Sequence, residues 1–331
     1  LSNRDTNGTL IGTIDKTVTG SGSRLIKNWL RRPLTDPKKI NKRLDYISEF
    51  IKDPKTLEFT QNILKETSDL ERILARVSIG KASPRDVLNI GLTLALIPII
   101  KQNTNKNSKK LRSLVKQFVS TNKICELINS TIKNDPPATT KNGGYILERV
   151  SKELDENRLL AEDASKWMAD MQKQEQLNNN IPSLKIGYNR VFGYYLEVTK
   201  AHIDKVPDYY IRKQTLTNSE RYFTSSLKEY EEKILSAKDK IIELELEIYE
   251  DIQKQILDFK DAIQQNARIL AQLDVISGLS RVAIDNNYTR PEINSKDNLS
   301  IKNGRHPVVE DLLSLGDDFV PNDLNLNNKD V

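Results

Sequence analysis

The residues best suited to ligand chemistry are small polar side chains and cations in the segment 178–226. They are Lys185, Asn189, Arg190, Thr217, Asn218 and Ser219. Cations, short hydrogen-bonding side chains and the free N–H groups of turns suit the oxygen atoms of phosphate groups. They do not suit the reading of base edges, because no helix or ribbon is predicted to carry them into a groove. The same residue types are common at turns for conformational reasons, so a purely structural role stays open.

Alternating apolar residues predict that this segment forms strands. The apolar residues occupy even-numbered positions: Leu184, Ile186, Tyr188, Phe192, Tyr194, Leu196 and Val198. Asn189 and Arg190 fall at the expected turn of a first hairpin. A second hairpin pairs 214–216 with 221–224 around Asn218 and Ser219. Four short strands would bury one face against helix ends, and we expect their turns to project away from those helices.

Two heptad patterns flank the strands and predict long helices that pair with each other. The first consists of Leu147, Val150, Leu154, Ala161, Ala164, Met168 and Met171. The second consists of Leu227, Tyr230, Ile234, Ala237, Ile241, Leu244 and Ile248, followed by a phase-shifted run from Ile252 to Leu270. Such a shift is a stutter that locally unwinds a supercoil. A continuous helix over 227–283 would be roughly 80 Å long. The simplest geometry is an antiparallel helix pair with the strands at its tip.

The remaining sequence excludes several classes of protein. One cysteine, Cys125, and two histidines make an internal disulfide impossible and leave no pattern for a zinc site. No apolar run reaches the length of about eighteen residues that a membrane helix needs. A net charge of +5 permits contact with nucleic acid without demonstrating it. The fold class that we expect is mainly α, with residues 1–144 as a helical core.

Several longer motifs identify a family. They are "LIGTIDKTVTGSGSRLIKNWLRRPL", "DLERILARVSIGKASPRDV", "LKIGYNRVFGYYLEVTK", "IRKQTLTNSERY" and "IKNGRHPVVE". In these motifs and in their order, the chain resembles the core, lever and clamp portion of the MutS family of DNA mismatch repair proteins. The resemblance covers nearly the whole chain. It implies that two MutS-type subunits close around double-stranded DNA, mismatched DNA included, and that the clamps grip its backbone without reading sequence.

The resemblance also assigns domain boundaries. It implies a helical core over 1–144, an outgoing lever helix over 145–177, a four-stranded antiparallel β clamp over 178–226 and a returning lever helix over 227–285. Residues 286–331 would begin a nucleotide-binding domain. Thr217 and Asn218 match a position where the clamp of the family approaches phosphate. Arg190 is predicted from the residues alone, since many relatives carry an uncharged residue there.

The C-terminal segment implies contact with ATP in a longer protein. "DDFVPNDLNL" resembles a family segment in which an aromatic and an aliphatic residue lie on adenine, here Phe319 and Val320. Ordinary packing of these two residues is the alternative. No G-x-x-x-x-G-K-[ST] loop is present, so we expect no ATP hydrolysis by this chain and expect ATP and Mg²⁺ for the intact, DNA-dependent ATPase. The mismatch-reading Phe-x-Glu motif of the family is also absent.

Two questions stay open at the level of sequence. A coiled-coil scaffold whose β tip binds a protein partner would explain the heptads equally well. An Asn- and Lys-rich composition with inserts such as "PPATTKNGG" fits a mitochondrial protein of a yeast. The bacterial cytoplasm and the nucleus are the alternative locations.

Overall fold

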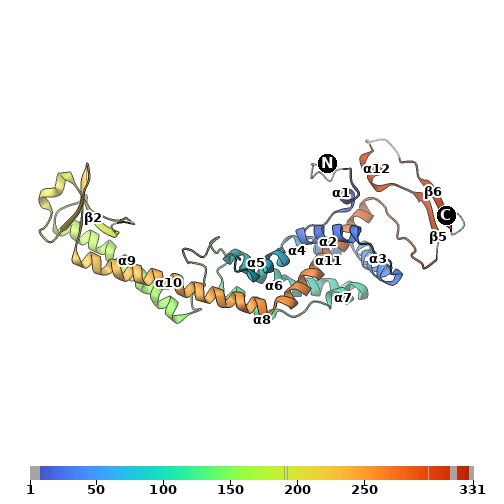
Figure 1. Cartoon of the computed structure of the whole chain (residues 1–331), viewed down its shortest axis with the longest axis horizontal. Coiled ribbons are helices and arrows are strands. Elements are labelled where there is room, and N and C mark those ends of the chain that lie inside the picture. Colours follow the sequence, from blue (N-terminus) through green and yellow to red (C-terminus); the bar gives the residue numbers. More distant parts are fainter. Residues whose placement is uncertain (1–7, 190, 192, 297, 314–318, 328–331) are drawn as a thin grey trace. The chain divides into compact units, whose positions relative to one another are not determined.

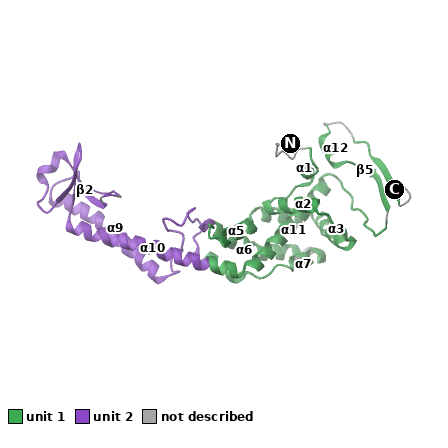
Figure 2. Ribbon diagram, in the orientation of Figure 1, with its two compact units in different colours: residues 1–82, 86–129, 253–331 green, residues 83–85, 130–252 purple. Residues whose placement is uncertain are grey.

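The computed structural model describes residues 8–189, 191, 193–296, 298–313 and 319–327, without the side chains of 105–107. The chain divides into two compact units (Figure 2). The helical unit comprises Leu1–Ala82, Asp86–Asn129 and Gln253–Val331. The hairpin unit comprises Ser83–Arg85 and Ser130–Ile252.

Several helices of the helical unit pack around one central helix. The helices that precede β5 in this unit, or extend into it, are α1 (Leu10–Ile14), α2 (Gly20–Arg31), α3 (Pro37–Lys52), α4 (Pro54–Lys65), α5 (Leu70–Ser78), α6 (Pro84–Asn107), α7 (Lys109–Val115), α8 (Asn122–Thr131), α10 (Ser225–Asp258) and α11 (Lys260–Asp285). Asp36 and Asp53 cap α3 and α4 through their side chains, and each precedes a proline at the first helical position. This combination satisfies a free N–H group and fixes the backbone for helix entry.

The central helix α11 packs against α2, α3, α4 and α5. Its buried residues come from all sides of the helix, as expected for a helix inside a core. Asp274 is among them, and its carboxylate accepts hydrogen bonds from the backbone N–H groups of Val18 (2.9 Å) and Thr19 (2.8 Å). A Cβ on Gly22 would lie 2.1 Å from Asp274 Oδ2, so this position needs glycine. Burial raises the pKa of Asp274.

The last part of the helical unit contains β5 (Asn298–Gly304), α12 (Pro307–Leu312) and β6 (Asn322–Asn327). β5 and β6 pair in the antiparallel sense, with Leu299 opposite Leu326 and Ile301 opposite Leu324. His306 caps α12, because its Nδ1 accepts a hydrogen bond from Val309 N (3.2 Å). The histidine therefore has a structural role at the start of a helix.

The hairpin unit contains a four-stranded antiparallel sheet. Its elements are β1 (Lys185–Asn189), β2 (Gly193–Thr199), the 3₁₀ helix η1 (Lys200–Lys205), β3 (Ile211–Thr215) and β4 (Ser219–Phe223), and the strand order is β1-β2-β4-β3. α9 (Lys152–Asn178) leads into the sheet and α10 (Ser225–Asp258) leads out of it. Leu196, Val198 and Tyr222 of the sheet share one apolar cluster with Met168 of α9 and Ile234 of α10. One face of the sheet is thus packed on both helices (Figure 1).

α9 and α10 run antiparallel within the hairpin unit. Trp167 stacks on Tyr230 near the sheet, and Arg158 meets Glu245 farther along both helices. Glu245 is fully buried, where its Oε1 pairs with Arg158 Nη2 (2.8 Å) and its Oε2 accepts the N–H groups of Gly144 (2.6 Å) and Tyr145 (3.1 Å). A buried charge is tolerated only when it is paired and hydrogen-bonded in this way. The pair fixes the loop before α9 to both helices.

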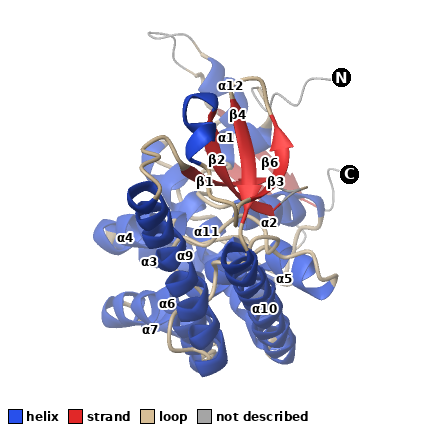
Figure 3. Ribbon diagram, turned by 90° about the vertical axis from the view of Figure 1, so that its left-hand side faces the viewer, coloured by secondary structure: helices blue, strands red, loops and turns tan. Residues whose placement is uncertain are grey.

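The coarse prediction of a mostly helical protein with a small four-stranded antiparallel sheet is confirmed (Figure 3). Two helix boundaries differ. The predicted continuous helix over 227–285 is interrupted at Phe259, which separates α10 from α11 close to the phase shift of the heptads. α9 begins at Lys152 rather than 145, because Ser151 caps it by accepting Leu154 N (3.3 Å). Among the described residues, no helix is long and apolar enough to cross a membrane.

Candidate nucleic-acid interface

The two hairpin turns of the four-stranded sheet lie at opposite ends of it. Asn189 pairs with Gly193 and Ile211 with Phe223, so the β1–β2 turn leaves the sheet where β4 ends. Thr199 pairs with Ser219 at the other end, where the β3–β4 turn leaves the sheet and β1 begins. The six residues predicted to contact phosphate are therefore divided between two ends rather than gathered at one.

The helices distinguish these two ends. Beside the β3–β4 end, Gln176 in the last turn of α9 donates a hydrogen bond to Leu184 O (2.7 Å). At the β1–β2 end, Tyr194 N donates to Glu231 of α10 (3.1 Å), so this end lies alongside that helix. The β3–β4 end therefore lies beside the last turn of α9, and the β1–β2 end lies beside α10. That the turns project away from the helices stays a prediction.

Exposed polar groups collect at the β3–β4 end. Thr217 and Asn218 form the turn and are both exposed. Lys185 is exposed at the start of β1, on the same end of the sheet. Lys200 begins η1 and is also exposed, and its N–H donates to Asn218 O (3.1 Å). Neither lysine forms an ion pair with a described residue, so both charges are available to an anion.

Ser219 does not belong to this exposed set. It is the first residue of β4 and is only 7% exposed, and its carbonyl accepts the N–H of Leu216 (2.9 Å). The prediction that Ser219 projects from a turn is wrong because the turn ends one residue earlier than expected. A residue that is buried to this extent cannot offer its hydroxyl to a phosphate outside.

A small hydrogen-bonded cluster supports the β3–β4 end. Ser183 Oγ is hydrogen-bonded to Thr199 Oγ1 (2.9 Å) and to His202 Nδ1 (3.1 Å), and Thr199 Oγ1 lies 3.3 Å from the same nitrogen. The cluster joins Ser183, two residues before β1, to the end of β2 and to η1. Lys200 and His202 are not among the residues predicted for the site, since only the register of the strands brings them to this end.

The β1–β2 end has a different character. Asn189 is half-buried, and its Oδ1 accepts Val191 N (2.8 Å), so its side chain closes the turn. Val191 is 81% exposed and Tyr188 49% exposed. Arg190, predicted to contact phosphate, lies outside the described residues. The described part of this end is therefore apolar, apart from an amide that the turn already uses.

The outer face of the sheet carries an arginine whose charge is already neutralised. Arg221 donates from Nε to Glu197 Oε2 (2.9 Å) and from Nη1 to Gln214 Oε1 (3.1 Å). Its guanidinium lies 4.2 Å from the ring centroid of Tyr195. A Cβ on Gly187 would approach that ring to 2.7 Å, so glycine makes room for the tyrosine. Arg221 therefore contributes rigidity to this face rather than free positive charge.

Tyrosines beneath the sheet stay protonated at neutral pH. Burial, followed by a hydrogen bond to Glu220, raises the pKa of Tyr222 to about 12. Burial likewise raises the pKa of Tyr210, which donates to Glu175 of α9 (2.8 Å). Among the described residues no three His, Cys, Asp or Glu side chains are arranged to hold a metal ion. The chemistry of the site is thus that of ammonium, hydroxyl and amide groups.

Phe319 and Val320, predicted to contact adenine, belong to the helical unit. They lie just before β6, where Phe319 is half-buried and Val320 is 75% exposed. They form a separate candidate site from the sheet of the hairpin unit.

Comparison with known proteins assigns the chain to a family. Residues 1–280 match the family model described as MutS domain III. The "DNA mismatch repair protein MutS" of Salinibacter ruber is 42% identical over 324 residues, which cover 98% of this chain and 36% of that protein. The proteins of the same name from Bacteroides fragilis and Alkaliphilus metalliredigens are 42% and 38% identical, covering 99% and 100% of this chain and 38% of each relative. The chain thus spans little more than a third of these relatives, and it belongs to the MutS family.

Proposed function

We propose that the protein acts in DNA mismatch repair and that its four-stranded sheet holds double-stranded DNA by the sugar-phosphate backbone. The observation that carries this proposal is the set of exposed groups at the β3–β4 end: Lys185, Lys200, Thr217 and Asn218. The names of the relatives support the repair role.

The chemistry of these groups favours contact with phosphate over contact with bases. Two ammonium groups release counterions from DNA, and a threonine hydroxyl and an asparagine amide donate hydrogen bonds to phosphate oxygens. A short turn offers no helix or ribbon that could enter the major groove. The sheet would therefore bind mismatched and matched duplexes alike, and discrimination would arise elsewhere, partly from the deformability of the DNA.

The helices on either side of the sheet have the role of levers in this proposal. The sheet shares one apolar cluster with α9 and α10, so a force on the β3–β4 end acts on both helices. They would couple DNA binding to an ATPase domain in a longer protein, which would work as a dimer of MutS-type subunits. A half-buried Phe319 beside an exposed Val320 fits contact with a planar base there, with ATP and Mg²⁺ as the cofactors. This sequence has no phosphate-binding loop to hold the phosphates or the ion.

Fluorescence anisotropy with a labelled duplex tests the proposal directly. The chain is titrated onto matched and mismatched duplexes of equal length at 50 mM and 200 mM salt. We expect weak binding of equal strength to both duplexes, with an affinity that falls steeply as salt rises. Binding that depends on the sequence and not on salt would contradict a backbone contact.

The alternative, a scaffold whose β tip binds a protein partner, is favoured by a different observation. Val191 and Tyr188 expose apolar surface at the β1–β2 end. A scaffold predicts that substitutions at the sheet disturb a protein partner and leave the affinity for DNA unchanged. The titration above separates the two functions, because a scaffold gives no salt-dependent binding of DNA.

The mitochondrial location also stays a prediction. The relatives named above are bacterial and do not test it. Microscopy of the full-length protein with a fluorescent tag in its own cells distinguishes a mitochondrial from a nuclear or cytoplasmic location.

A further inference from the structure

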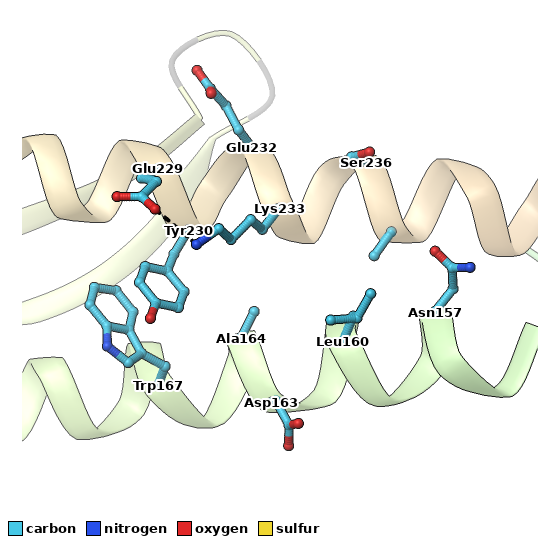
Figure 4. Close-up of a pocket in the computed structure, with 11 residues that line it drawn as sticks. Asn157, Leu160, Asp163, Ala164, Trp167, Glu229, Tyr230, Glu232, Lys233 and Ser236 are labelled. Atoms are coloured by element: carbon cyan, nitrogen blue, oxygen red, sulfur yellow. Dashed lines mark hydrogen bonds and ion pairs between the residues drawn. The ribbon is translucent and has the colours of Figure 1, made fainter. Parts of the chain in front are cut away.

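A groove with a volume of about 740 Å³ lies between α9 and α10. Its floor is apolar and is formed by Leu160, Ala164 and Trp167 of α9 with Tyr230 and Ala237 of α10. Figure 4 shows the rings of Trp167 and Tyr230 between the two helices, where their centroids are 3.5 Å apart and their planes 4° apart. Leu160 is 61% exposed. An exposed leucine beside stacked aromatic rings is the composition of a contact surface.

The rim of the groove is acidic. Asp163 and Glu232 point away from the line between the helices, on the outer sides of α9 and α10 (Figure 4). The one lysine of the lining, Lys233, is already paired with Glu229 (2.8 Å). A second hollow of about 720 Å³, lined by residues of α10 alone, continues from Glu232 to Glu243, where Lys240 is paired with Glu243 (2.9 Å). No described cation forms an ion pair with Asp163, Glu232 or Asp239.

The length of this surface decides what kind of ligand fits. The two hollows follow α10 from Glu229 to Glu243, which is about 21 Å at 1.5 Å per residue. That is about four turns of helix, longer than a compact pocket for a small molecule. The small side chains of Ala164 and Ala237 leave the floor of the groove open. The apolar part of this surface lies between two paired helices, a geometry that accepts a third, amphipathic helix.

The charge of the rim decides the character of that helix. Unpaired carboxylates repel the phosphates of DNA and attract lysine and arginine. We propose that the groove between α9 and α10 binds a basic amphipathic α-helix of a partner protein. Its apolar residues, spaced three and four apart, pack on Leu160, Trp167 and Tyr230. Its basic residues flank that stripe and face Asp163 and Glu232. This site is separate from the β3–β4 end and does not depend on DNA binding.

A synthetic peptide of eighteen residues, with leucine and lysine arranged as an amphipathic helix, tests the proposal. Trp167 reports its binding in a Trp29→Phe background, since the chain has two tryptophans. We expect saturable 1:1 binding with a change in Trp167 emission. The double variant Asp163→Lys/Glu232→Lys should weaken the affinity by about tenfold or more, because it replaces attraction by repulsion.

Matched variants guard against a non-specific charge effect. Asp170→Lys/Glu247→Lys changes the net charge equally at exposed positions of the same helices that do not line the groove. It should leave the affinity within about twofold, and circular dichroism verifies that both variants are folded. The proposal is overturned if this control weakens binding as much as the rim variant does. Equal binding of a leucine–glutamate peptide, or no saturable binding of the lysine peptide, would overturn it as well.

Discussion

The two ends of the four-stranded sheet differ in charge, in exposure and in attachment. The β3–β4 end carries Lys185, Lys200, Thr217 and Asn218, all exposed. The described part of the β1–β2 end presents Val191 and Tyr188. One hydrogen bond attaches the β1–β2 end to Glu231 of α10, whereas the β3–β4 end lies beside the last turn of α9, where Gln176 donates to Leu184 O.

In the proposed function, one small sheet separates an end that binds DNA from an end that anchors the sheet. The apolar, attached end fixes the direction of the strands relative to α10. The polar end then holds its cations at a fixed place without using them for packing. A contact to the DNA backbone that is independent of sequence requires only a rigid support and a few free hydrogen-bond donors or cations.

The largest effect is expected for Gly193 at the attached end. Its backbone has φ +73°, and a Cβ there would lie 1.7 Å from Glu231 Oε1. Gly193→Ala therefore adds backbone strain and breaks the hydrogen bond from Tyr194 N to a charged acceptor, at a cost of about 2–3 kcal/mol. Urea denaturation followed by Trp167 emission in the Trp29→Phe background measures this loss.

Gly144→Ala is the control for that prediction. Gly144 has φ +88° in the same unit, with open space where a Cβ would lie. This variant should cost only the strain, about 1 kcal/mol. Equal losses for the two glycines would show that Glu231 does not anchor the β1–β2 end.

The second effect concerns the two lysines at the polar end. Lys185→Ala/Lys200→Ala should lower the affinity for duplex DNA by about tenfold near 0.1 M salt and reduce the salt slope by about 2, because two phosphate contacts are lost. Lys173→Ala/Lys228→Ala removes the same charge from exposed positions on α9 and α10. Anisotropy titrations should show a loss of DNA affinity for the Lys185/Lys200 variant alone. Equal losses for both double variants would show that the effect comes from net charge and not from a specific site.

A smaller effect is expected for the turn amide. Asn218→Ala removes one neutral donor and should weaken DNA binding about threefold, in line with about 0.5–1.5 kcal/mol for a hydrogen bond. Asn189→Ala is the matched change at the other end, where the side chain accepts Val191 N. It should lower the stability of the hairpin and leave the DNA affinity unchanged at a temperature where both variants are folded. If Asn189→Ala weakened DNA binding and Asn218→Ala did not, the β1–β2 end would be the one that contacts DNA.

The smallest effect is expected for Val191→Ser. The side chain is 81% exposed, so its replacement should change the free energy of unfolding by less than about 0.5 kcal/mol and should not affect DNA binding. Urea denaturation and anisotropy measure the two quantities. A marked loss of DNA affinity would place the β1–β2 end on the DNA.

The sequence carried enough information for the strands but not for their ends. Alternation correctly placed Leu196 and Val198 on the packed face, because a pleated strand has a period of two. The same alternation predicted a buried Tyr188, but this residue is about half exposed near the end of β1. Ser219 was misplaced because a turn boundary depends on a local backbone conformation that one residue can shift.

The site was predicted only in part for a related reason. Lys185, Thr217 and Asn218 could be proposed from residue type, yet their grouping with Lys200 follows from the antiparallel register of three strand pairs. The phase shift of the heptads lies close to Phe259, where α10 and α11 are separated. A sequence repeat alone cannot distinguish a local unwinding of the supercoil from an interruption of the helix. Ser151 before α9 was a helix-start signal that the heptad pattern concealed.

Site-specific crosslinking tests the central claim most directly, namely that the β3–β4 end lies on the DNA backbone and the β1–β2 end does not. In a Cys125→Ala background, which removes the one native cysteine, a photoreactive label is attached at Thr217→Cys or at Val191→Cys and irradiated with duplex DNA at low salt. We expect crosslinks from position 217 with every DNA sequence tested and few from position 191. Crosslinks of equal or greater yield from position 191 would contradict this claim.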